Sequence, residues 1–193
     1  MSGPSIVTLA APCFTLAACL SVVSPNTYAQ GPNPMDATKQ TDQGIGNRQV
    51  INRLAGDHSV VTQTALPGSR GNVQTATTSS PGTIGHRISQ RTAGSGNTQS
   101  AVVLGGEGST VSQRAGAGSK GNVQSAVIDG GSNIVEQVQN GTSTGNVASV
   151  VQSGHGNHAV QSQTGRGQVS RIVQYGNQGS VAVQQQGRTQ TSE

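Results

Sequence analysis

Side chains that could catalyse a reaction or bind a metal are few and scattered along this sequence. Its histidines are His58, His86, His155 and His158. His155 and His158 lie close together, as metal ligands often do, but too few carboxylates accompany them. We therefore expect all four histidines to be solvated turn residues, and we predict no metal site.

The acidic residues and the glycine-rich stretches point to no enzyme either. The carboxylates do not form the Asp-rich turns of a calcium-binding β-roll or the paired carboxylates of a glycosidase. Gly94-Ser95-Gly96 is followed by neither Lys-Ser/Thr nor a helix, as a phosphate-binding loop would require. The sequence therefore predicts a protein with no catalytic activity and no cofactor.

The chemistry that does recur is that of the side-chain amide. Asn146 to Gln152 and Asn157 to Gln163 are two copies of one seven-residue unit. Twelve such windows start at Asn47, Asp57, Asn72, Ile84, Asn97, Glu107, Asn122, Gly131, Asn146, Asn157, Gln168 and Gln178. Alternate windows, from Asn47 on, recur after 25, 25, 25, 24 and 22 residues. Two windows therefore make one repeat, and six such repeats are typical of a solenoid.

A period of two residues within each window indicates a strand with one face turned inward. The fifth residue of the window is aliphatic in eleven of twelve cases, and Gln161 is the exception. The first and seventh residues share that face and are mostly amides. We predict a ladder made of Asn72, Asn97, Asn122, Asn146, Asn157, Gln63, Gln90, Gln113, Gln137, Gln152, Gln163, Gln174 and Gln184. Isolated buried amides are costly, but amides that stack at the strand spacing of roughly 4.8 Å bond one another. The third residue of four windows is also a glutamine on this inward face: Gln49, Gln74, Gln99 and Gln124.

The windows predict an all-β fold. Each is too short for a helix, is rich in β-branched residues, and is bounded by Gly or Pro. Pro67 and Pro81 fall in connectors, where they disturb no strand pairing. We predict a parallel β-solenoid of six strand-turn-strand coils over residues 47–187, amyloid-like and cross-β when assembled. Residues 30–46 are expected to be a disordered leader, and residues 188–193 a short polar tail.

Residues 1–29 are expected to be a secretory signal peptide. The stretch from Ser5 to Val23 is apolar, and Thr27 and Ala29 suit cleavage after Ala29. Two alternatives stay open: an uncleaved transmembrane anchor, and a lipoprotein signal with Cys19 as the lipidated residue. Cleavage after Ala29 would leave no cysteine, which excludes disulfides and thiol catalysis.

The formal net charge of +4 comes from eleven Lys and Arg residues, which are dispersed. No basic run and almost no aromatic residue accompanies them, so no specific nucleic-acid binding is predicted. Weak binding to anionic surfaces stays open.

The windows resemble the curlin repeat of curli amyloid fibre subunits, whose pattern is Ser-x5-Gln-x4-Asn-x5-Gln. It appears as Gly131 to Gln137 leading to Asn146 to Gln152, as Asn157 to Gln163 leading to Gln168 to Gln174, and as Asp57 to Gln63 leading to Asn72. The connectors vary more in length than in the major subunits of that family. The resemblance covers Asn47 to about Gln184. The opening Ser is replaced by Asp57, Ile84, Glu107, Gly131 and Gln178. Four windows end in Arg53, Thr78, Val103 and Ile128 instead of Gln.

The resemblance implies a secreted subunit that polymerises with itself into cell-surface fibres for adhesion and biofilm matrix. It also implies a sister subunit or nucleator and an outer-membrane secretion channel as partners. Whether this chain would be a major subunit or a nucleator stays open. The alternative function is a monomeric β-solenoid adhesin that displays outward residues such as Val60, Arg87 and Val147 to a ligand.

Overall fold

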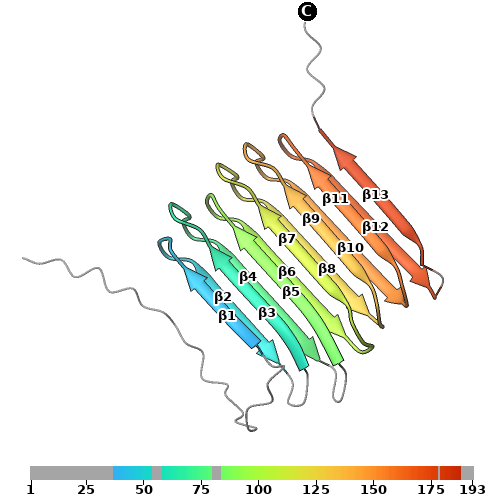
Figure 1. Ribbon diagram of the computed structural model, residues 1–193. Coiled ribbons are helices and arrows are strands. Elements are labelled where there is room, and N and C mark those ends of the chain that lie inside the picture. The colour runs from blue at the N-terminus through green and yellow to red at the C-terminus, as the bar shows by residue number, and fades with distance from the viewer. Residues whose placement is uncertain (1–36, 54–57, 80–83, 178, 188–193) are drawn as a thin grey trace, which may run out of the picture.

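The computed structural model describes residues 37–53, 58–79, 84–177 and 179–187. All the regular structure within these ranges is β-strand, in two parallel sheets (Figure 1). The seven-stranded sheet contains β1 (Ala37–Asp42), β3 (His58–Ala65), β5 (Ile84–Thr92), β7 (Thr110–Ala115), β9 (Ile134–Gln139), β11 (His158–Gln163) and β13 (Val181–Gln186), in that order. The six-stranded sheet contains β2 (Arg48–Arg53), β4 (Val73–Ser79), β6 (Thr98–Leu104), β8 (Val123–Asp129), β10 (Val147–Gly154) and β12 (Val169–Gly176).

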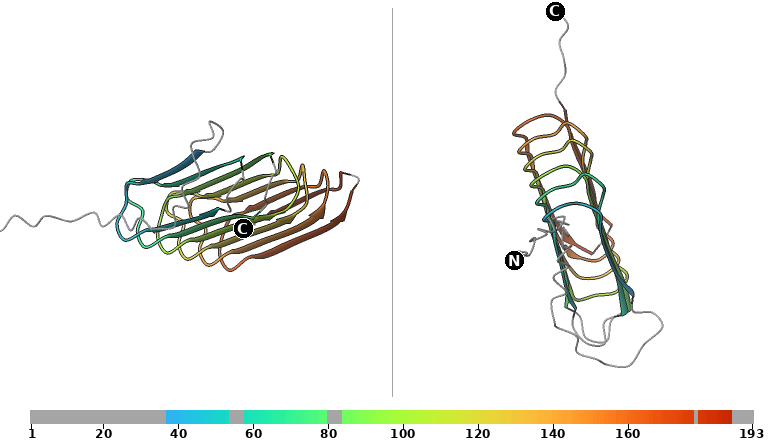
Figure 2. Two further views of the ribbon diagram at one scale, coloured as in Figure 1. Left: turned by 90° about the horizontal axis from the view of Figure 1, so that it is seen from below. Right: turned by 90° about the vertical axis from the view of Figure 1, so that its left-hand side faces the viewer.

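The chain passes from one sheet to the other at every connection, so each pair of strands makes one coil. Figure 2 shows the two sheets facing each other across a thin interior, with the corners stacked at both ends. The predicted parallel β-solenoid is confirmed. The two sheets hold β2 to β13 as six complete coils, and β1 is an additional strand.

Two rows of aliphatic residues, with Val103 and Ile128 beside them, form the core. Alternate residues along the strands are buried, as in β3 and β4, because successive side chains of a strand point to opposite faces. One row runs along the seven-stranded sheet, as Val61, Ile88, Val111, Val135, Ala159 and Ala182. The other runs along the six-stranded sheet, as Ile51, Ala76, Ala101, Ala126, Val150 and Ile172. The predicted inward face is therefore confirmed.

The predicted register is wrong in one window. Ala159, and not Gln161, pairs with Val135 on one side and with Ala182 on the other. The window starting at Asn157 is thus displaced by two residues from the others of this sheet. A shift of two residues leaves the same face inward, which is why the alternation alone did not reveal it.

β1 lies within the segment expected to be a disordered leader, so that expectation is wrong for Ala37–Asp42. The segment has no aliphatic face of its own. It is ordered because it pairs with β3 over six residues, and Gln40 adds a side-chain bond to Gln63.

Glycines at the corners allow successive coils to approach closely. Gly94 has a φ of 103° and Gly130 a φ of 119°, a region that favours glycine. A Cβ at Gly94 would overlap the Ser119 carbonyl oxygen, and one at Gly130 would overlap the Gly154 carbonyl oxygen. Pro67 lies in the turn between β3 and β4, as predicted.

No described residue belongs to a helix with the length and hydropathy needed to cross a membrane. The expected signal peptide and its alternatives, residues 30–36, Pro81 and the tail at 188–193 lie outside the described residues.

Candidate functional site: amide ladders and sheet edges

A row of glutamines runs along the inner face of the seven-stranded sheet, and we call it the long ladder. It contains Gln40, Gln63, Gln90, Gln113, Gln137 and Gln161. The Nε2 of each donates to the Oε1 of the next at 2.8–2.9 Å. Four of the residues in the predicted ladder, Gln63, Gln90, Gln113 and Gln137, are thus joined within one chain.

Most of these glutamines also bond across the interior. Their Nε2 groups donate to carbonyl oxygens of the six-stranded sheet, at Val50, Thr75, Ser100, Ser125 and Ser149, over 2.8–3.0 Å. Each of these amides thus has partners in the neighbouring coil and in the facing sheet. These bonds offset the cost of burying polar groups and hold the two sheets together.

Three shorter glutamine rows complete the interior. Gln49, Gln74, Gln99 and Gln124 bond in series at 2.7–2.8 Å. Gln139, Gln163 and Gln186 bond at 3.1 Å, and Gln152 bonds Gln174 at 2.8 Å. Every glutamine-to-glutamine bond in the four rows runs from an N-terminal coil to the next C-terminal one.

Outside the long ladder, the buried glutamine of each coil changes from the six-stranded to the seven-stranded sheet midway along the solenoid. In the first coils a glutamine occupies the third window position of the six-stranded sheet, and the facing strand ends in a small residue. Gln124, for example, donates to the carbonyl oxygen of Arg114, next to buried Ala115. From Gln139 on, the glutamine stands at the strand end, and Ala148 or Ser170 takes the third position. Gln163 accordingly donates to the carbonyl oxygen of Val147, next to Ala148. The volume of the interior is thereby kept similar from coil to coil.

The asparagine row differs from the predicted ladder. The Oδ1 atoms of Asn47, Asn72, Asn97, Asn122 and Asn146 accept from the backbone N–H one coil later, the last from Gln168, at 2.9–3.1 Å. Among the described residues of this row, direct amide-to-amide bonds join only Asn72 to Asn47 and Asn97 to Asn72. The asparagines therefore satisfy backbone groups at the corner, where the strand pairing begins.

Asn157 belongs to a second corner row, with Asn133. Its backbone N–H donates to Asn133 Oδ1 at 2.9 Å. The equivalent bonds in earlier coils join Asn133 to Ser109 and Ser109 to His86 Nδ1. His86 is fully buried, so its prediction as a solvated turn residue is wrong. The imidazole takes the place of an asparagine.

The predicted ladder residues thus fall into several rows. Gln163 lies in the row with Gln139 and Gln186, apart from the long ladder. Gln184 is in register with Gln161, but Ser170 Oγ joins the two side chains. The sequence prediction missed Gln40, Gln139, Gln161 and Gln186. The signal was their spacing, since Gln161 lies 24 residues after Gln137 and Gln40 lies 23 before Gln63.

The two ends of the solenoid differ in polarity. At the C-terminal end, Val169, Val181 and Val183 are 67–70% exposed. At the N-terminal end, β1 presents Thr38, Lys39 and Asp42, all exposed. Only the C-terminal end therefore presents an unpaired edge flanked by valines.

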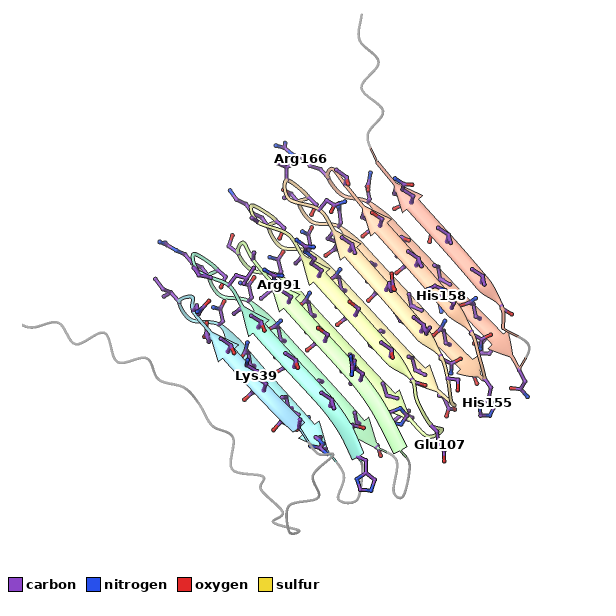
Figure 3. All side chains as sticks on the ribbon, in the orientation of Figure 1. Lys39, Arg91, Glu107, His155, His158 and Arg166 are labelled. Atoms are coloured by element: carbon purple, nitrogen blue, oxygen red, sulfur yellow. The ribbon has the colours of Figure 1, made fainter. Side chains whose placement is uncertain are left out.

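Basic residues gather on the outer face of the seven-stranded sheet. Lys39, Arg87, Arg91 and Arg114 are exposed there, together with one acid, Glu136. Figure 3 shows Lys39 on the first strand and Arg166 at a corner. Arg166 ends a row of stacked corner residues that starts at Ile45, and Arg70, Lys120 and Arg166 occupy every second place in this row. The described part of the chain has no group of three or more His, Cys, Asp and Glu that could hold a metal ion.

Comparison of the chain with protein-family models, with curated proteins and with solved structures found no match. The likeness to the curlin repeat therefore rests on the sequence pattern alone.

Proposed function

We propose that the chain is a secreted structural subunit that polymerises with itself into extracellular, curli-like amyloid fibres for adhesion and biofilm matrix. The fibre would be a continuation of the solenoid, in which the last coil of one copy stacks on the first coil of another. The curlin resemblance of residues 47 to about 184 supports the extracellular setting. It also supports a nucleating sister subunit and an outer-membrane channel as partners.

The observation that carries the proposal is the open C-terminal edge. The outer edges of β12 and β13 have no neighbouring strand among the described residues. Exposed strand edges template pairing with another chain, and solenoids normally cover them. Here the edge is flanked by exposed valines, and Arg171 is the one charged residue of β12 and β13.

The interior adds a second support. Glutamine rows with the same bond direction in every coil are the arrangement that repeats across molecules in cross-β fibres. A coil added from another copy would gain the same bonds that each internal coil already has. Stability then grows with every added copy, because a coil buries its apolar residues only against its neighbours.

The test is assembly of the purified chain from Gln30, which contains every described residue. Thioflavin fluorescence and electron microscopy should show unbranched fibres that grow faster when seeds are added. A chain that remains monomeric at high concentration, with or without seeds, contradicts the proposal.

A second candidate function is favoured by the basic outer face of the seven-stranded sheet. Lys39, Arg87, Arg91 and Arg114 against a single Glu136 would attract an anionic polymer or surface. A monomeric adhesin of this kind would bind such a polymer without forming fibres, so the assembly experiment separates the two functions.

A further inference from the structure

The additional strand β1 prevents two intact copies from stacking without a gap. β1 pairs with β3, whereas the outer edge of β2 has no partner among the described residues. If β13 of one copy were placed on β1 of the next, β12 and β2 would be separated by an empty strand position. The two sheets of the fibre would then be discontinuous at every junction.

We infer that β1 is a replaceable cover on the edge of β3, and that the strand that replaces it is β13 of a second copy. This inference rests on the proposed self-assembly. Once β1 has left, β13 of the first copy pairs with β3 of the second, and β12 pairs with β2. Each copy then contributes six strands to each sheet, and the stack has no gap.

The register shows that β1 and β13 suit the same place. Both strands have six residues. Thr38, Gln40 and Asp42 of β1 lie beside Val61, Gln63 and Ala65. Ala182, Gln184 and Gln186 occupy these positions in β13, as their pairing with β11 shows. Thr38 is the one residue that is not aliphatic in the interior row that contains Val61 and Ala182. Ala182 would restore an aliphatic residue at that place, so β13 fits the edge of β3 better than β1 does.

The hydrogen bonds at the two ends are complementary. Gln63 Oε1 accepts from Gln40 Nε2 at 2.9 Å, and this bond is the first of the long ladder. At the other end, Gln184 Nε2 donates to no described residue. Because the ladder runs in one direction, Gln184 of one copy offers the donor that Gln40 now supplies to Gln63.

The asparagine row gives an independent second match. Gln168 Oε1, at the C-terminal end of that row, is buried and has no partner among the described residues. At the N-terminal end, the backbone N–H of Asn47 has, within the described part of the chain, no side-chain acceptor of the kind that each later member of the row has. A second copy stacked end to end places this acceptor beside this donor.

β1 also has the residues that natural edge strands use against unwanted pairing. Lys39 lies on its outer face, and the charged Asp42 lies on its inner face. A lysine and an inward-pointing charge both discourage pairing at a strand edge. Asp42 Oδ1 accepts from Gly44 N–H at 2.9 Å and from Asn47 Nδ2 at 2.8 Å. The carboxylate therefore ends the strand at its own corner, and this corner is held to the next coil by Ile45, whose N–H donates to the Ser69 carbonyl oxygen.

The exchange favours the fibre once it has begun. The pairing of β1 with β3 is replaced by an equally long pairing of β13 with β3. The six-stranded sheet gains a new pairing, of β12 with Arg48–Arg53. β1 must leave before either forms, so the isolated chain is protected from spontaneous assembly.

A disulfide that holds β1 in place tests the inference. Lys39 and Thr62 are register partners on the outer face, and neighbouring strands have the Cα spacing that a disulfide needs. The variant is Lys39→Cys with Thr62→Cys in the chain from Gln30, which lacks Cys13 and Cys19. The matched control is Ser89→Cys with Ser112→Cys, a pair in the same outer row between β5 and β7.

The oxidised Lys39/Thr62 variant should not elongate wild-type fibre seeds, and reduction should restore elongation. The control pair should elongate seeds in both redox states. Hydrogen exchange gives a second readout: amides of residues 37–42 should be protected in the monomer and unprotected in the fibre. Elongation by the oxidised Lys39/Thr62 variant at the reduced rate, or protection of residues 37–42 in fibres, would overturn the inference and leave the proposed function standing. Failure of the wild type and the control to form any fibre would overturn both.

Discussion

The side-chain nitrogen of Gln137 donates to the side-chain oxygen of Gln161 at 2.8 Å, one coil further along the solenoid. This bond lies where the seven-residue pattern of the sequence is interrupted, at the displaced window that starts with Asn157. The long ladder is continuous through the interruption. The amide contacts, more than the spacing of the windows, therefore define the register of the coils.

Removal of one inner glutamine should destabilise the fold far more than removal of its outward neighbour. Gln113→Ala would remove the hydrogen bonds that Gln113 makes with Gln90 Nε2, with the Ser100 carbonyl oxygen and with Gln137 Oε1. We expect a loss of about 2 to 4 kcal/mol in the free energy of unfolding, from unsatisfied groups and a cavity. Ser112→Ala, on the exposed face, should change it by less than about 0.5 kcal/mol. Urea unfolding of the monomer measures both, and equal losses would contradict the assignment of the inner face.

The change of sheet by the glutamines should appear as coupling between Gln139 and Ala148. Ala148→Gln alone would overpack the interior and cost about 1 to 3 kcal/mol. Gln139→Ala alone would remove the side-chain hydrogen bonds to the carbonyl oxygens of Val123 and Asn146. The double variant should be less destabilised than the sum by about 1 kcal/mol or more. Simple additivity in a double-mutant cycle would show that the two positions do not share one space.

Proline in the last complete coil should stop fibre growth. Ile172 lies in the middle of β12, in register with Val150, and Ile172→Pro removes a backbone N–H and disturbs that strand. We expect seeds of the wild type not to be elongated by this variant. Ser80→Pro, beside Pro81 in a connector outside the described residues, should elongate them normally. Growth of seeds by Ile172→Pro at the normal rate would show that β12 takes no part in the junction.

The basic outer face should govern binding to anionic polymers. Arg87→Gln, Arg91→Gln and Arg114→Gln together remove three of its exposed charges. The triple variant should elute from a sulfated polysaccharide column at a lower salt concentration. It has fewer positive charges to attract the anionic polymer, so less salt is enough to screen the attraction. Arg171→Gln, on the six-stranded sheet, is the control and should change retention much less. Unchanged retention of the triple variant would place the attraction elsewhere.

The fold could be predicted from the sequence because one physical signal repeats twelve times. Inward aliphatic residues, amides on the same face and glycine corners all agree, so the errors of single windows do not accumulate. The window at Asn157 shows the limit of this signal. Ala159 and Gln161 both face inward, and only contact with Val135 and Gln137 decides which row each joins.

The features that the sequence did not predict depend on partners far along the chain. β1 has no hydrophobic pattern, and it is a strand only because β3 offers an edge. The asparagines were correctly expected to face inward, but the direction of the backbone N–H at the corner decides that they bond the main chain. His86 is buried for the same reason, as a neighbour of Ser109 in a corner row.

The mass per unit length of single filaments tests end-to-end stacking most directly. Six coils per copy at roughly 4.8 Å each give one chain for about every 29 Å of filament. Scanning transmission electron microscopy of unstained fibres of the chain from Gln30 should give this value, or a whole multiple where filaments run side by side. Oriented fibres should also diffract near 4.8 Å along the fibre axis. A mass per length that is no whole multiple of one chain per about 29 Å would contradict a fibre built by continuing the solenoid.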